Sequence, residues 1–155
     1  FKLIQAMKRI PGSDEQGSID AERLAKWTET VRKSCAELSR IGIADVVIGQ
    51  LLASAQIGKD GAWPCEAVRT VMEGLQSEDM MRGVHTGVYN SRGFHTRGQG
   101  GDQERQLAEK YRKWAQQLRM SSPFMASELL MKLTDTYERE AAREDTEARI
   151  NQRLR

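Results

Sequence analysis

The chain has 155 residues, of which 39% are hydrophobic and 30% charged, and its 24 Lys and Arg nearly balance its 22 Asp and Glu. This length suits one compact domain, and a net charge of +2 argues against a globally basic nucleic-acid or membrane-surface protein. No apolar run approaches the roughly 18 residues of a transmembrane helix, and regularly spaced Leu, Ile, Val and Met exclude a disordered chain.

The first third of the chain shows three helical patterns. Residues 1–10 place apolar side chains on one face and stop at Pro11-Gly12. Asp20 is typical of a helix N-cap, and the stripe from Leu24 to Leu38 behind it has the spacing of an amphipathic helix. Residues 44–55 are apolar on nearly every side, so we expect them to form the most buried helix.

Three further helices are predicted in the rest of the chain. Trp63-Pro64 favours a helix start that leads to about Met81. Asp102 is the expected N-cap of a second helix, and Ser122-Pro123 opens the last one. These elements predict a mainly α fold, an irregular antiparallel bundle of about six helices with short connections. Apolar positions become sparse near the end, so residues 142–155 are expected to form a helical tail that projects from the core.

Residues 82–101 interrupt the helical pattern. This segment holds six of the 13 glycines, both histidines and three arginines, and it has no acidic residue. Such a composition predicts a small β-hairpin insert near residues 84–97 that turns around Asn90 to Gly93. Because side chains alternate along strands, the favoured register places Thr86, His95 and Arg97 on one face, and Arg92 lies in the turn.

These four side chains form a candidate anion-binding site. Glycine amides and guanidinium groups suit an oxyanion, either a small anionic ligand or a nucleic-acid backbone. The alternative is structural: the glycines serve turn geometry, and the arginines pair with helix carboxylates such as Glu104 and fix the hairpin to the bundle.

Catalytic and metal chemistry find little support in the sequence. Two cysteines, Cys35 and Cys65, do not make a disulfide framework, and both have the pattern of small buried residues in a reduced, cytoplasmic protein. Together with His85 and His95 they lack the close ligand pair of a zinc site. We therefore predict no catalytic residue, no metal and no cofactor.

Three strings carry a resemblance: Gly-Val-Tyr-Asn-Ser-Arg-Gly at 87–93, Gly-Gly-Asp-Gln-Glu-Arg at 100–105 and Tyr-Glu-Arg-Glu-Ala at 137–141. They resemble the C-terminal region of large bacterial multidomain proteins of unassigned function. The resemblance implies that the single helical domain 1–155 is part of a longer polypeptide.

The expected function is a non-enzymatic interaction or assembly module of a larger bacterial protein. Its partner is expected to be another domain or chain, reached through the C-terminal helix, and no membrane is involved. The alternative is an accessory domain that binds an anion or nucleic acid through the basic, glycine-rich segment 82–101.

Overall fold

The computed structural model describes residues 2–7, 9–91 and 100–153, and it shows a packed helical bundle, as predicted. The elements, in chain order, are α1 (Lys2–Gln5), α2 (Ala21–Ala36), α3 (Ile41–Leu52), α4 (Glu66–Leu75), α5 (Glu78–Ser91), α6 (Asp102–Leu118), α7 (Pro123–Met125), the π-helix η1 (Ala126–Met131) and α8 (Lys132–Arg153).

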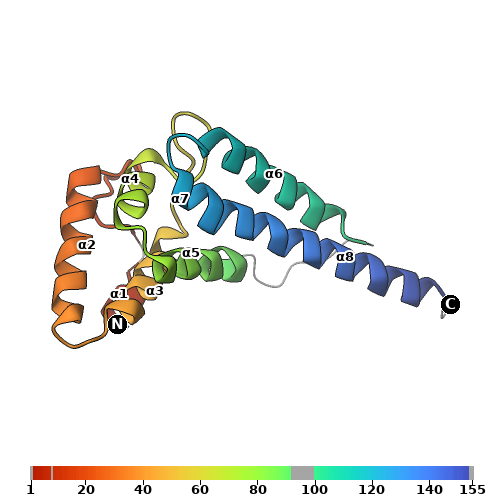
Figure 1. Cartoon of the computed structure of the whole chain (residues 1–155), viewed down its shortest axis with the longest axis horizontal. Coiled ribbons are helices and arrows are strands. Elements are labelled where there is room, and N and C mark those ends of the chain that lie inside the picture. The colour runs from red at the N-terminus through yellow and green to blue at the C-terminus, as the bar shows by residue number, and fades with distance from the viewer. Residues whose placement is uncertain (1, 8, 92–99, 154–155) are drawn as a thin grey trace.

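The molecule is elongated. Helices α1 to α5 gather at one end, and α6 and α8 lie antiparallel as a long hairpin that extends to the other end (Figure 1). Helix α5 lies against α3 on one side and η1 on the other, so it joins the two parts. Among the described residues, no helix is long and apolar enough to cross a membrane.

Two predictions for the first part are confirmed. The Asp20 carboxylate accepts a hydrogen bond from the Arg23 amide at 3.0 Å and caps α2. Helix α3 begins three residues before the predicted buried segment 44–55 and ends at Leu52, and the part from Ala44 onward is mostly buried. Its buried residues are Ala44, Asp45, Val47, Ile48, Gly49, Leu51 and Leu52.

The predicted β-hairpin is wrong where the structure describes it, because residues 84–91 belong to helix α5; residues 92–97 lie outside the described part. The glycines that suggested a turn serve close helix contact instead. A Cβ on Gly83 would stand 2.1 Å from the Val46 carbonyl oxygen, and one on Gly87 would stand 2.6 Å from the Ala53 Cβ. Glycine lets α5 approach the backbone of α3, and this packing outweighs its poor helix propensity.

The single helix predicted from Trp63-Pro64 to Met81 is also wrong, since it divides into α4 and α5. The break lies at Gln76, whose φ of 47° is left-handed. Ser77 directly precedes α5 and caps it, because its hydroxyl accepts the Met80 amide hydrogen at 3.2 Å. A left-handed C-cap residue other than Gly gives no strong sequence signal, so the apolar spacing predicted one continuous helix across Gln76.

A buried carboxylate fixes the position of this break. Asp45 on α3 is only 3% exposed, and Arg32 on α2 donates Nε to its Oδ1 at 2.8 Å and Nη2 to its Oδ2 at 3.2 Å. The Ser77 hydroxyl donates to the same Oδ2 at 2.6 Å. One acid therefore holds α2, α3 and the start of α5 together, and its charge is paired as a buried charge requires.

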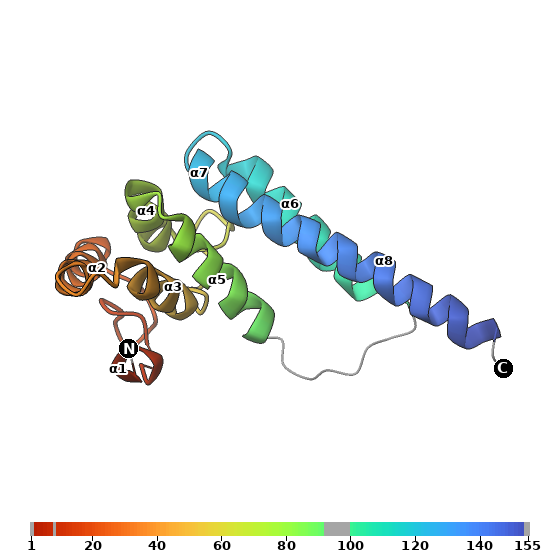
Figure 2. The same ribbon diagram turned by 60° about the horizontal axis from the view of Figure 1, so that its bottom comes forward.

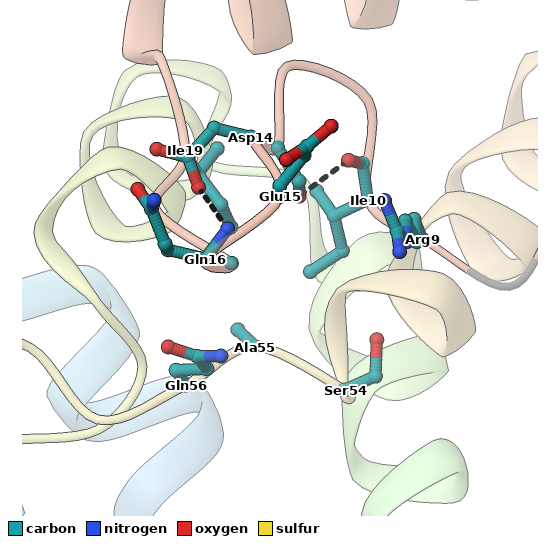
Figure 3. A pocket seen from close by; sticks show the side chains of 11 residues that line it. Arg9, Ile10, Asp14, Glu15, Gln16, Ile19, Ser54, Ala55 and Gln56 are labelled. Carbon is teal, nitrogen blue, oxygen red and sulfur yellow. Dashed lines mark hydrogen bonds between the residues drawn. The ribbon is translucent and has the colours of Figure 1, made fainter.

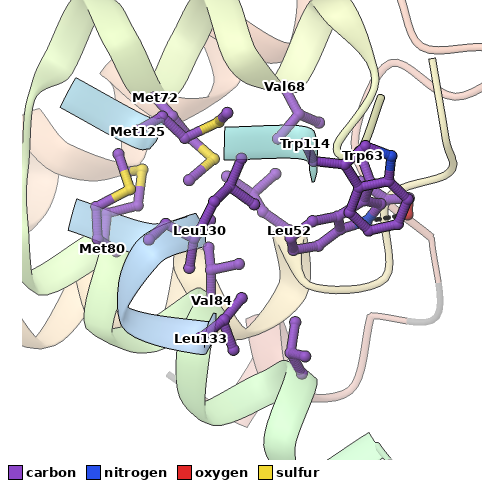
Figure 4. Close-up of a cluster of buried hydrophobic side chains, with 14 of the residues drawn as sticks. Leu52, Trp63, Val68, Met72, Met80, Val84, Trp114, Met125, Leu130 and Leu133 are labelled. Atoms are coloured by element: carbon purple, nitrogen blue, oxygen red, sulfur yellow. Dashed lines mark hydrogen bonds between the residues drawn. The ribbon is translucent and has the colours of Figure 1, made fainter. Parts of the chain in front are cut away.

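The core is continuous across both parts. Met72, Met80 and Met125 meet at one end of the cluster drawn in Figure 4, and Trp63 and Trp114 lie together at the other. Both indoles satisfy their N–H groups: Trp63 donates to the Ala55 carbonyl at 2.8 Å and Trp114 to the Gly61 carbonyl at 2.9 Å. Methionines fill the irregular space where α4, α5 and α7 converge.

The start of the last helix is confirmed, with Pro123 in its first turn. The Glu73 carboxylate of α4 accepts the amide hydrogens of Phe124 at 3.0 Å and Met125 at 3.1 Å. The chain then passes through η1 into α8 without a break. Every residue from 146 to 153 is exposed except Ala148, which is partly buried, and this end of α8 extends past α6 (Figure 2).

Two local predictions need correction. The N-cap of α6 is Gly101 and not Asp102, because the Asp145 carboxylate of α8 accepts the Gly101 amide hydrogen at 2.9 Å. Asp102 lies in the first turn and pairs with Arg105 at 2.5 Å. The two cysteines, Cys35 and Cys65, are free thiols, but both are partly exposed rather than buried.

Candidate functional site

The predicted anion site falls largely beyond what the structure describes. Arg92, His95 and Arg97 lie outside the described residues, and only Thr86 can be placed, partly buried on α5. The site therefore stays a prediction. The described half of the segment instead contributes to a cleft between α5 and the η1–α8 helix.

This α5–α8 cleft has a volume of about 470 Å³ and is lined mainly by charged and polar side chains. Helix α5 contributes Glu78, Met81, Arg82 and His85, and the η1–α8 helix contributes Glu128, Lys132, Asp135, Thr136 and Arg139. Spacings of three and four residues along each helix bring these side chains to the facing surfaces.

His85 of α5 contacts α8 across the cleft. Its Nε2 is 2.9 Å from the Thr136 hydroxyl oxygen. That hydroxyl donates its hydrogen to the Lys132 carbonyl at 2.8 Å, so Nε2 is the donor to Thr136 and the neutral ring carries its hydrogen there. Burial lowers the pKa of His85, and the nearby Arg139 guanidinium lowers that pKa further. The imidazole is therefore neutral at pH 7, with Nδ1 as an acceptor.

The cations of the cleft differ in their partners. Arg82 pairs with Asp79 at 2.5 Å, and Lys132 pairs with Glu128 at 2.5 Å. Arg139 contacts the Thr136 hydroxyl at 3.4 Å and has no carboxylate partner among the described residues. Arg139 is therefore the cation of the cleft that an added anion could neutralise, in a cleft that also contains the Glu78 and Asp135 carboxylates. Sequence reasoning missed this cleft because it placed His85 in a hairpin and gave no reason to bring it to Thr136.

A second cavity system lies between the loop 12–20 and the segment 54–58 (Figure 3). It consists of two adjoining clefts of about 280 Å³ and 570 Å³. They share Gln16, Gly17, Ile19 and Gln56 as lining residues. We call the larger one the loop cleft; Ile57, Lys59, Cys65 and Glu66 complete much of its wall.

The loop 12–20 is rigidly built. The Asp14 carboxylate accepts the amide hydrogens of Gln16 at 2.9 Å and Ser18 at 2.8 Å. An antiparallel bridge joins Ser13 to Ile19. The sequence indicated only a polar turn here, because nothing in it shows that segment 54–58 packs beside this turn.

No three His, Cys, Asp or Glu side chains among the described residues are grouped to hold a metal ion. Comparison of the chain with protein-family models, curated proteins and solved structures gives no match.

Proposed function

We propose that this chain is a non-enzymatic interaction or assembly module of a larger bacterial protein in the cytoplasm. In this proposal, the exposed end of α8 contacts a second copy of the chain. The observation that carries the proposal is the extension of α8 past α6, which leaves Ile150 52% exposed on a helix end with little packing of its own.

The charges around Ile150 suit a symmetric contact. Glu147 and Arg153 lie three residues before and after Ile150, on the same side of the helix. Glu147 accepts a hydrogen bond from Arg143 at 3.0 Å within the helix, an exposed pair that a second copy can share. When two copies of this helix end cross antiparallel at Ile150, each Glu147 meets the Arg153 of the other copy. A two-fold interface of this kind is self-complementary, and the apolar contact lies at its centre.

Sedimentation equilibrium over a concentration series tests this proposal. We expect concentration-dependent dimers of the full chain, loss of dimers in Ile150→Glu, and retention in the matched control Asn151→Glu, which adds the same charge on another side of α8. Glu147→Arg should weaken the dimer, and addition of Arg153→Glu should restore it. A wild-type chain that stays monomeric at every concentration contradicts the proposal, as does an equal effect of the two glutamate variants.

A second candidate function is anion binding, and the unpaired Arg139 beside Lys132 and His85 in the α5–α8 cleft favours it. NMR titration with inorganic phosphate and with a short single-stranded oligonucleotide tests it. Binding that weakens with added salt and with Arg139→Ala, but not with the control Arg149→Ala on the same helix, supports the candidate. Equal chemical-shift changes on titration of the Arg139→Ala and Arg149→Ala variants contradict anion binding in the α5–α8 cleft.

A further inference from the structure

The loop cleft presents unpaired backbone groups on both of its walls. In the Ser13–Ile19 bridge, the Asp14 amide donates to the Ser18 carbonyl at 2.9 Å and the Asp20 amide donates to the Gly12 carbonyl at 3.0 Å. This pattern makes Ser13 and Ile19 a non-hydrogen-bonded pair, whose own N–H and C=O groups point away from each other. Ile19 therefore has a donor and an acceptor on the side turned away from Ser13, and it is one of the residues that line the loop cleft.

The opposite wall is residues 55–58, which belong to no helix, strand or turn and have the same property. The Ala55 and Gly58 amides are bonded to the Leu52 and Ala62 carbonyls, at 3.0 and 2.8 Å. Between them, the backbone N–H and C=O groups of Gln56 and Ile57 make no hydrogen bond within the part of the chain that the structure describes. Two short segments thus line one cavity, and each has backbone polar groups without a hydrogen-bond partner among the described residues.

The side chains of the cleft add an apolar contact and one charge. Ile57 is 52% exposed beside the half-buried Ile19, so both offer aliphatic surface. Glu66 is engaged with Arg69 at 3.4 Å, whereas Lys59 has no carboxylate partner among the described residues. Arg69 also donates to both Asp60 oxygens at 2.8 Å, so it is shared between two carboxylates. Lys59 is the cation of the cleft that remains available to an acidic side chain of a ligand.

We infer that the loop cleft binds an extended peptide segment that carries an apolar β-branched residue next to an acidic one. The peptide backbone pairs with Ile19 on one side and with Gln56 and Ile57 on the other, as in strand addition. Its apolar side chain packs between Ile19 and Ile57, and its carboxylate meets Lys59. This site is separate from the α8 end, so the dimer experiment and the experiment below fail independently.

Selection of a phage-displayed library of random heptapeptides on the immobilised full chain, followed by synthesis of the enriched peptides, tests this inference. We expect peptides with adjacent β-branched and acidic residues. N-methylation of a peptide amide that pairs with the protein should weaken binding about fivefold for each hydrogen bond lost, whereas N-methylation of its neighbours should not. Enrichment no greater than on the bare support, or binding insensitive to every N-methylation, overturns the inference.

Protein variants locate the binding site. Ile57→Pro removes one of the unpaired amides and should weaken the selected peptides, whereas Ile57→Val should not. Lys59→Glu should weaken them about tenfold, with Lys59→Arg as the control that retains the charge. Circular dichroism checks each fold, and if Ile57→Pro is unfolded, Lys59→Glu and the N-methylated peptides decide. Peptides that bind folded Ile57→Pro and Lys59→Glu as tightly as the wild type place the site elsewhere and contradict the inference.

Discussion

Gly83 and Gly74 are both helical glycines, but only one has a neighbour that excludes a side chain. A methyl group at Gly83 would meet the Val46 carbonyl at 2.1 Å, while nothing lies within 4 Å of a Cβ at Gly74. We expect Gly83→Ala to lower the free energy of unfolding by about 1–3 kcal/mol, because α3 and α5 must move apart. Gly74→Ala should raise it by roughly 0.5–1 kcal/mol through helix propensity. Urea denaturation measures both, and equal signs would contradict the close α3–α5 packing.

His85 gives the second residue-scale prediction. Because its pKa in the folded protein is below the ordinary value of 6.5, the unfolded chain binds more protons between those two pH values. The stability that His85 contributes is therefore complete above about pH 6.5 and falls as the pH drops toward its folded pKa. We expect urea midpoints to decline from pH 7.5 to 5.5, and His85→Gln to decline less over that range. An NMR titration in which His85 has a pKa above 6.5 would reverse the sign.

Among the elements, α2, α3 and α5 depend on the Asp45 carboxylate. Asp45→Asn leaves the Arg32 guanidinium without its charge partner and weakens the contact to Ser77. We expect the free energy of unfolding to fall by about 3 kcal/mol, at the low end for a broken buried pair, because the Arg32 side chain stays 25% exposed. Lys113→Gln removes an exposed pair with Glu109 at 3.9 Å and should cost no more than about 0.5 kcal/mol. Equal losses in chemical denaturation would contradict this assignment.

In α5 the tertiary contact outweighs the local sequence pattern. Local patterns predicted α2 and α3 correctly, because a cap residue and a continuous apolar face act within one helix. Gly83, Val84 and Gly87 suggested a strand and a turn, since glycine and valine favour helix weakly in isolation. Here the backbone of α3 selects the glycines, and this contact joins residues more than 30 positions apart. The Gly-x-x-x-Gly spacing was the available signal, and it indicates a helix face that approaches another helix.

The candidate sites follow the same rule. His85 was recognised as a polar residue in an unusual segment, but its neighbour on α8, Thr136, is 51 positions away in the sequence. The loop cleft also depends on tertiary packing, because residues 16–19 and 56–59 meet only when α3 is folded against the loop. Sequence patterns therefore identified residues with chemistry, but the folded chain determined which of them share a cavity.

For the whole molecule, the end of α8 is expected to be dispensable for folding. Removal of residues 146–155 deletes residues 146–153, which are exposed except for Ala148, and keeps Asp145 with its bonds to Gly101 and Arg105. We expect the free energy of unfolding to change by less than about 1 kcal/mol, as for other exposed surfaces. Truncation after residue 140 also removes the buried Ala141 and Glu144 and should destabilise the chain clearly in thermal unfolding. A large loss in the shorter deletion would show that this end packs within the fold.

The π-helix η1 also has a consequence for how related sequences should be aligned. A π turn accommodates one more residue than an α turn, so it rotates everything that follows it around the helix axis. In this chain the rotation gives α8 its phase, with Leu133, Tyr137 and Ala141 facing inward. A homologue that lacks one residue between 126 and 131 would form an uninterrupted α-helix there. The residues that correspond to Leu133, Tyr137 and Ala141 would still face inward, but their sequence numbers would be lower by one. A single-residue gap at this point is therefore the mark of a common ancestor whose helix gained or lost the bulge.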